Sequence, residues 1–147
     1  MFKEPQRGYK FLEHTSDAYI EAWAPTFEEA LVESASAFYQ TMLSLENVQP
    51  KEEEQIQVSG HDEKELLFNW LETLLLRFDI DGMAYSTFKI NSISPETQPL
   101  KLRATISGET YSREKHGAKV EIKGITYHLM TIDKQPNRVT IRFILDL

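Results

Sequence analysis

The segment from Asp62 to Gly82 carries the broadest apolar face of the 147-residue chain. Its large apolar residues recur at steps of three and four, which predicts a helix with one buried side. These residues are Leu66, Leu67, Trp70, Leu71, Leu74, Leu75 and Phe78. Asp62 and Glu65 form a capping pattern, and Asp81-Gly82 supplies the turn that ends the helix. Burial of each large side chain stabilises a fold by roughly 1.5 to 3 kcal/mol. We therefore expect this helix at the centre of the core, with Trp70 as a core residue.

The remaining segments predict one further helix and mainly strands. Thr26 can cap the earlier helix with Glu29 as its partner, and we expect this helix to end near Asn47 to Pro50. Its apolar stripe comprises Phe27, Ala30, Leu31, Phe38, Met42 and Leu45. Alternating or β-branched and aromatic segments are typical of strands. The predicted strands are Tyr9 to Glu13, Ala18 to Ala24, Glu54 to Ser59, Ala84 to Ile93, Lys101 to Ser107, Lys119 to Lys123, Tyr127 to Ile132 and Val139 to Asp146.

The order of these elements determines the expected fold class. Helices cluster early in the chain and strands cluster late, which favours an α+β fold over alternating βαβ units. We expect two helices packed on a largely antiparallel or mixed β-sheet. A hydrophobic content of 41% in 147 residues suits one domain, residues 1–147, with a single core.

Composition excludes several classes of function. With no cysteine, the chain has no disulfide, thiolate zinc site or cysteine nucleophile. A net charge of -7 opposes direct, sequence-independent binding of nucleic acid. The same charge is also common in acidic domains for which it serves only solubility. The charged start and the lack of a long apolar run predict a cytoplasmic protein.

Two aspartates are candidate ligands for a hard cation. In the last strand Val139, Ile141, Phe143 and Leu145 form the predicted core face, so Asp146 projects from the opposite face near the strand end. Asp17 lies in the polar turn between the first two strands. Either aspartate could instead be an ordinary solvated or turn-capping residue. Together they could bind Ca²⁺ or Mg²⁺ through oxygen, but periodicity does not show that they meet.

Four more polar residues are candidates for a functional surface: His14, Glu109, Lys123 and His128. A single histidine in a strand is more often structural than catalytic. The chain offers no recognisable nucleophile and base pair, no glycine-rich phosphate loop and no paired-histidine zinc pattern. This favours a helper protein over an enzyme.

Three segments in order resemble motifs of the archease family. Residues 11–18 (FLEHTSDA) resemble the family's opening motif, residues 123–128 (KGITYH) its second and residues 142–147 (RFILDL) its third. The resemblance extends over nearly the whole chain, with Gly124 standing where alanine is usual. That change removes no ligand.

The resemblance implies a specific function. Archeases are accessory proteins of RtcB-type RNA ligases, which join RNA ends in tRNA splicing and RNA repair with GTP and a divalent metal. They promote guanylylation of the ligase and multiple turnover. By this resemblance Asp17, Asp146 and the terminal carboxylate of Leu147 bind a divalent cation, expected to be Ca²⁺, with Mg²⁺ or Mn²⁺ as alternatives. His14, Glu109, Lys123 and His128 would line the same polar surface, facing the nucleotide or the ligase.

Two other classes of function stay open on the residues alone. A stand-alone metal-dependent phosphoesterase would use the same carboxylates with His128 as acid or base. A general chaperone or binding module is suggested only by the acidity of the chain and the absence of catalytic motifs.

Overall fold

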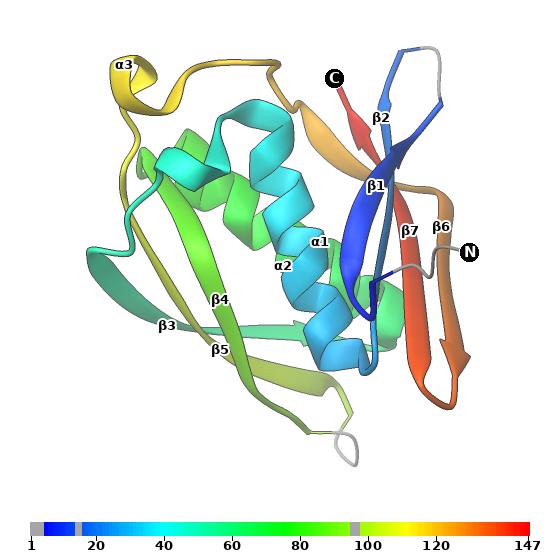
Figure 1. Cartoon of the computed structure of the whole chain (residues 1–147). Helices are drawn as coiled ribbons and strands as arrows, with labels where there is room; N and C mark the ends of the chain where they lie inside the picture. The colour runs from blue at the N-terminus through cyan, green and yellow to red at the C-terminus, as the bar shows by residue number, and fades with distance from the viewer. Residues whose placement is uncertain (1–4, 14–15, 95–97) are drawn as a thin grey trace.

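The computed structural model describes residues 5–13, 16–94 and 98–147. The chain forms helices and strands in an α+β arrangement (Figure 1). In chain order they are β1 (Gly8–Leu12), β2 (Ala18–Ala24), α1 (Phe27–Met42), the short 3₁₀ helix η1 (Leu45–Asn47), β3 (Glu52–Gly60), α2 (Glu63–Asp79), β4 (Met83–Ser94), β5 (Leu100–Thr110), α3 (Arg113–His116), β6 (Gly124–Gln135) and β7 (Arg138–Asp146).

The strands form two antiparallel sheets with α1 and α2 between them (Figure 1). One sheet has the order β1-β2-β7-β6, and the other has the order β3-β5-β4. Each helix bridges the sheets, since α1 packs on β2 and β4 while α2 packs on β3 and β6. The predicted α+β class is confirmed. The division of the strands into two sheets was not predicted.

Trp70 lies fully buried at the centre of the core, as predicted. Its indole N–H donates to the carbonyl oxygen of Leu31 at 3.0 Å, which satisfies the one polar group of the ring. The Tyr39 hydroxyl, also fully buried, donates to the carbonyl oxygen of Leu74 at 3.0 Å. These two bonds join α1 to α2 in the layer between the sheets.

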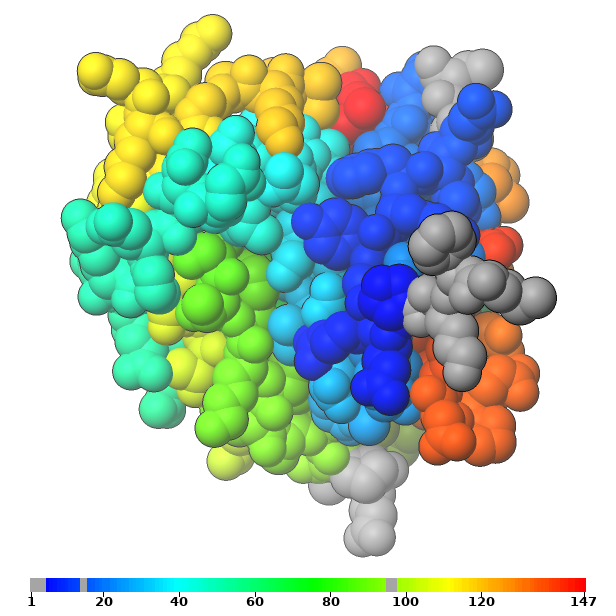
Figure 2. Space-filling model, in the orientation of Figure 1, coloured from blue at the N-terminus to red at the C-terminus, as the bar shows by residue number. Residues whose placement is uncertain are grey.

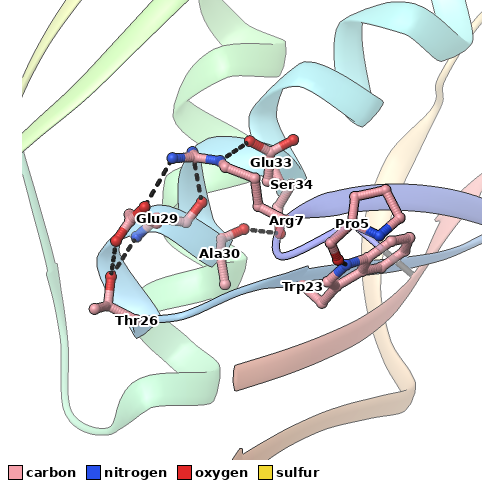
Figure 3. A network of polar contacts seen from close by, with 8 residues as sticks. All are labelled: Pro5, Arg7, Trp23, Thr26, Glu29, Ala30, Glu33 and Ser34. Carbon is pink, nitrogen blue, oxygen red and sulfur yellow. Dashed lines mark hydrogen bonds and ion pairs between the residues drawn. The ribbon is translucent and has the colours of Figure 1, made fainter. Parts of the chain in front are cut away.

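Both predicted helix caps are present. The Thr26 hydroxyl accepts from the Glu29 amide at 3.2 Å, and the Asp62 carboxylate accepts from the Glu65 amide at 2.8 Å. Figure 3 shows that Arg7 reaches over the first turns of α1, where its guanidinium donates to Glu29 and Glu33. These contacts hold the start of the described chain against α1.

Two local predictions were wrong, and one short helix was missed. The predicted strand from Lys119 to Lys123 is an extended segment outside both sheets, because the Lys119 amide donates to the carbonyl of Met42 at the end of α1 instead of to a strand. The first helix ends at Met42, and Leu45 belongs to η1. The short helix α3 was not predicted at all.

The alternation predicted for the last strand is confirmed. Val139, Ile141, Phe143 and Leu145 are buried in the core, while Arg142 and Asp146 are exposed on the other face. Ile144 is buried as well, although it is on the outer face.

Candidate functional site

Asp17 and Asp146 lie at the same end of the four-stranded sheet. Strands β2 and β7 pair antiparallel with Ala18 opposite Leu145, so continuing this ladder by one residue sets Asp17 opposite Asp146. Asp146 is exposed on the outer face of β7. Ile20 and Ala22 of β2 point into the core, and continuing that alternation to Asp17, one residue before the strand, assigns it to the same outer face. Opposite residues in such a ladder have Cβ atoms about 4.5–5.5 Å apart. Two carboxylates at this spacing can share one cation.

The position of Asp146 is fixed from the β6 side as well. Its carbonyl oxygen accepts from the Lys123 amide at 2.7 Å, and Gly124 is its partner in the ladder. Lys123 is exposed, and this backbone bond places it next to Asp146. Leu147 follows Asp146 and packs against the core, which anchors the end of β7. Figure 2 shows the C-terminal residues reaching the surface between the N-terminal strands and the segment that precedes β6.

An ion-pair row across the outer face holds the register of the strands that carry the two aspartates. The Glu21 carboxylate on β2 accepts from Arg142 on β7 at 2.8 Å and pairs with Lys10 on β1 at 3.1 Å. Burial acts to raise the pKa of Glu21, but the bonds and charges of Arg142 and Lys10 outweigh burial and lower the pKa. A one-residue slip would exchange the two faces of a strand and break this row. The row therefore helps to keep Asp17 opposite Asp146.

His128 lies farther along β6, where the strand bulges. The register of β6 against β7 shifts between Thr126 and Thr131, and His128 is exposed within that bulge. Its backbone amide donates to the Thr126 hydroxyl at 3.1 Å, and its ring is open to a partner or ligand. The predicted surface residue His14 lies outside the described residues.

Glu109 has a different environment from the one predicted. It is only 7% exposed at the end of β5 and its carboxylate accepts from the Gln49 amide at 2.9 Å. Lys115 and the fully buried His116 bond the same carboxylate, at 2.8 and 2.9 Å. The His116 Nδ1 accepts from a backbone amide, so Nε2 carries the proton and donates to Glu109. Glu109 thus joins α3, β5 and the segment before β3.

This arrangement predicts an acid-dependent loss of stability. Bonds from the Gln49 amide, Lys115 and His116 hold the pKa of Glu109 well below its usual value, although burial opposes them. A depressed pKa gives a stabilisation that is complete above the pKa of an unfolded carboxyl, about 4.3, and is lost as pH falls toward the folded pKa. We expect Glu109→Gln to lower the free energy of unfolding at pH 7, and the gap from wild type to shrink below about pH 4.

Urea unfolding of both proteins between pH 7 and pH 3 measures that gap. Glu53→Gln is the matched control, because Glu53 is an exposed glutamate on β3. A gap for Glu109→Gln that stays constant down to pH 3 would contradict the ion-paired carboxylate described above.

The donor set at this end of the four-stranded sheet fits a hard divalent cation. Carboxylate oxygens are the ligands that Ca²⁺ and Mg²⁺ prefer. Within residues 5–13, 16–94 and 98–147, no three His, Asp or Glu side chains come together as a metal-binding group. A cation held by Asp17 and Asp146 would therefore need further oxygens from the main chain, the terminal carboxylate of Leu147 or water.

Sequence reasoning did not identify two buried polar residues, Glu21 and His116. Glu21 is a buried carboxylate in a strand, and it follows Ile20 in an otherwise apolar run, which is an available signal for an ion pair. His116 gave no signal, since its burial depends on α3, Gln49 and Glu109 meeting in the fold.

Comparison with known proteins gives consistent results for sequence and fold. The Archease protein family matches residues 9–147. Protein archease of Methanopyrus kandleri is 38% identical over 92% of this chain and 96% of its own length, and that of Thermococcus kodakarensis is 35% identical over 96% and 99%.

Two solved structures share the fold. The solution structure of Methanobacterium thermoautotrophicum protein 1598 is similar with a TM-score of 0.79 at 30% identity, covering 95% of this chain and 99% of that one. The crystal structure of a Thermotoga maritima archease, described as a possible chaperone, has a TM-score of 0.61 at 18% identity, covering 100% and 98%. No helix in the described part of this chain has the length and apolarity to span a membrane. The family match extends from β1 to the last residue, and the chain belongs to the Archease protein family.

Proposed function

We propose that this protein is a metal-binding accessory protein that activates an RtcB-type RNA ligase in tRNA splicing or RNA repair. It promotes guanylylation of the ligase and multiple turnover, and it is not itself a catalyst. The observation that carries the proposal is the pairing of β2 with β7, which sets Asp17 and Asp146 at one sheet end in a chain of the Archease family. Lys123, bonded through its amide to Asp146, adds a cation beside them.

The residues at this end of the four-stranded sheet have distinct roles in the proposal. Asp17, Asp146 and the terminal carboxylate of Leu147 hold a divalent cation, with Ca²⁺ as the expected ion and Mg²⁺ or Mn²⁺ as alternatives. A bound cation supplies positive charge that polarises phosphate oxygens. Lys123 and His128 face the nucleotide or the ligase, because an ammonium and an exposed imidazole suit phosphate oxygens.

The charge of the protein supports an indirect contact with RNA. At a net charge of -7, the chain gains little binding free energy from contact with the phosphate backbone of RNA, because such binding depends on clustered Lys and Arg. In our proposal the ligase holds RNA and GTP in the cytoplasm. This protein presents to the ligase the end of the sheet that carries Asp17, Asp146 and Leu147.

A turnover assay tests the proposal. An RtcB-type ligase from the same source is given excess RNA, with and without this protein and with its Asp146→Asn variant. We expect wild-type protein to convert a single round of ligation to many rounds, and the folded variant to lose that effect. No change with wild-type protein, given an active ligase, would remove the proposed function.

A chaperone is the second candidate, because several large apolar side chains are exposed on this protein and the Thermotoga relative is described as a possible chaperone. A chaperone would suppress aggregation of unrelated proteins without a divalent cation. Aggregation assays with two unrelated substrates, with and without EDTA, separate the two functions.

A further inference from the structure

The outer face of the three-stranded sheet β3-β5-β4 is polar. Helices α1 and α2 pack on the other face of this sheet (Figure 1), where Val58, Leu102 and Ala104 are buried in the core. Alternate side chains along the strands therefore point away from the core. On β5 these are Lys101, Arg103, Thr105 and Ser107. Their partners on β3 and β4 are Glu, Gln, Ser, Thr or Lys residues. The face carries no apolar or aromatic side chain at these positions.

The charges on this face differ from those of the whole chain. The chain has a net charge of -7, yet Lys89, Lys101 and Arg103 point outward from β4 and β5 and are exposed. In the part of the chain that the structure describes, none of these three cations has an ion-pair partner. Unpaired cations gathered on one face of an acidic protein are complementary to an anionic partner.

Carboxylates near this face do not cancel its positive charge. Glu53 also points outward, but it lies at the other end of the sheet from Lys101. Glu109, at the end of β5, is buried and already ion-paired. At the β4 edge, Glu28 lines a groove together with Lys89. The positive charge is therefore centred on the two cations of β5.

A groove of about 320 Å³ opens beside Arg103 on this face. Its lining residues are Gln55, Ile56, Gln57, Asn91, Arg103 and Ala104. A β-bulge adds Asn91 to β4, and its amide donates to the Thr105 hydroxyl at 2.9 Å, which holds it on the outer face. A guanidinium has five N–H donors and a carboxamide has two. The groove therefore offers many donors and no carboxylate, which suits an oxyanion such as a phosphate group.

We propose that this outer face binds the phosphodiester backbone of the ligase's RNA substrate, with one phosphate group in the groove at Arg103 and a neighbouring phosphate at Lys101. The inference rests on the proposed function, which brings RNA to this protein. A planar guanidinium binds two phosphate oxygens at once, and an ammonium acts as a point charge. The outward positions of the three strands hold no aromatic ring on which a base could stack, so the contact is independent of RNA sequence. A second copy of this chain would bring like charges together.

The ligase makes a weak contact of this kind effective. Binding through a few cations is weak for free RNA, and the net charge of -7 opposes it further. RNA already held by the ligase meets the face at a high effective concentration, so the contact needs little affinity of its own. Asp17 and Asp146 lie at the end of the other sheet, and the contact with RNA therefore leaves the proposed cation site free.

The RNA dependence of ligation by the ligase together with this protein tests the inference. We expect Lys101→Gln with Arg103→Gln to raise the KM for RNA about fivefold or more, with kcat, cation binding and affinity for the ligase unchanged. The dependence of log(kcat/KM) on the logarithm of the salt concentration should become less steep by about 1.4, since each phosphate contact on a single strand contributes about 0.7. Both side chains are exposed, so the fold should be retained.

Lys64→Gln with Arg113→Gln is the matched control, because it makes the same charge change at two exposed cations outside this sheet. We expect this pair to change the KM for RNA less than about twofold. An equal rise in both double variants would show an effect of net charge alone and would overturn the inference. A loss of affinity for the ligase in the Lys101 and Arg103 variant would assign the face to protein binding and overturn it too.

Amide NMR shifts of this protein alone give a second readout. We expect a single-stranded RNA oligomer at low salt to move the signals of Gln57, Lys101 and Arg103. Inorganic phosphate should move the same signals at a higher concentration, because it offers one phosphate group where RNA offers several. RNA-induced shifts confined to residues outside this sheet would overturn the inference.

The proposed function and this inference fail separately. A wild-type protein that does not stimulate an active ligase removes the proposed function, while RNA-induced shifts on β5 would still support binding of RNA by this face. Stimulation of the ligase with an unchanged KM in the folded Lys101 and Arg103 variant, together with no RNA-induced shifts on β5, overturns the inference alone.

Discussion

Asp146→Asn is expected to weaken divalent-cation binding by more than about a hundredfold, because even outer-shell changes at metal sites cost 10–100-fold. Asparagine keeps the size of the side chain but removes the charge that a hard cation requires. The fold should be retained, since Asp146 is exposed and its bond from Lys123 uses the backbone. Calorimetric titration with CaCl₂ and MgCl₂ measures the affinity.

Asp133→Asn is the matched control for that titration. Asp133 is exposed on β6 of the same sheet, where its carboxylate accepts from Gln135 at 3.1 Å. We expect cation affinity close to wild type in this variant. Cation at 100 times its Kd should also stabilise the wild type by about 2.7 kcal/mol and leave Asp146→Asn unaffected. Equal affinities in wild type and Asp146→Asn would show that the site assignment is wrong.

Trp70→Ala is expected to lower the free energy of unfolding by about 3–5 kcal/mol. That is a large part of the roughly 5–15 kcal/mol available to a typical domain. The ring is fully buried between α1 and α2, and its removal leaves a cavity and deletes the bond to Leu31. Urea unfolding followed by circular dichroism measures the loss.

Trp70→Phe is the comparison for this prediction, since it keeps an aromatic ring in the core and loses the indole N–H. We expect a smaller destabilisation from it than from Trp70→Ala. A Trp70→Ala protein that unfolds at the wild-type urea concentration but no longer stimulates the ligase would give Trp70 a functional role instead of a structural one.

The elements that sequence predicted well depend on short-range chemistry. Thr26 and Asp62 each cap a helix through an amide three residues away, so a local pattern contains the whole interaction. The alternation in β7 likewise predicted that Asp146 faces outward. The placement of Asp17 opposite Asp146 is different, because it is inferred by continuing the register of β2 and β7, two strands far apart in the sequence.

The features that sequence missed depend on distant partners. Residues 119–123 alternate like a strand, yet Lys119 bonds the end of α1 and only Lys123 reaches β7. Glu109 reads as a polar residue at a strand end, and its burial requires His116 and Gln49. No local pattern contains these contacts.

The central position of β7 has a consequence for how the protein folds. The ion pair between Glu21 and Arg142 joins residues 121 positions apart, and β7 lies between β2 and β6. During synthesis, β1 and β2 leave the ribosome before β7 does. Until β7 is synthesised, the edge of β2 that pairs with β7 stays unpaired. Contacts of such long range form slowly. A cation held by Asp17 and Asp146 would therefore bind only after β7 has paired with β2.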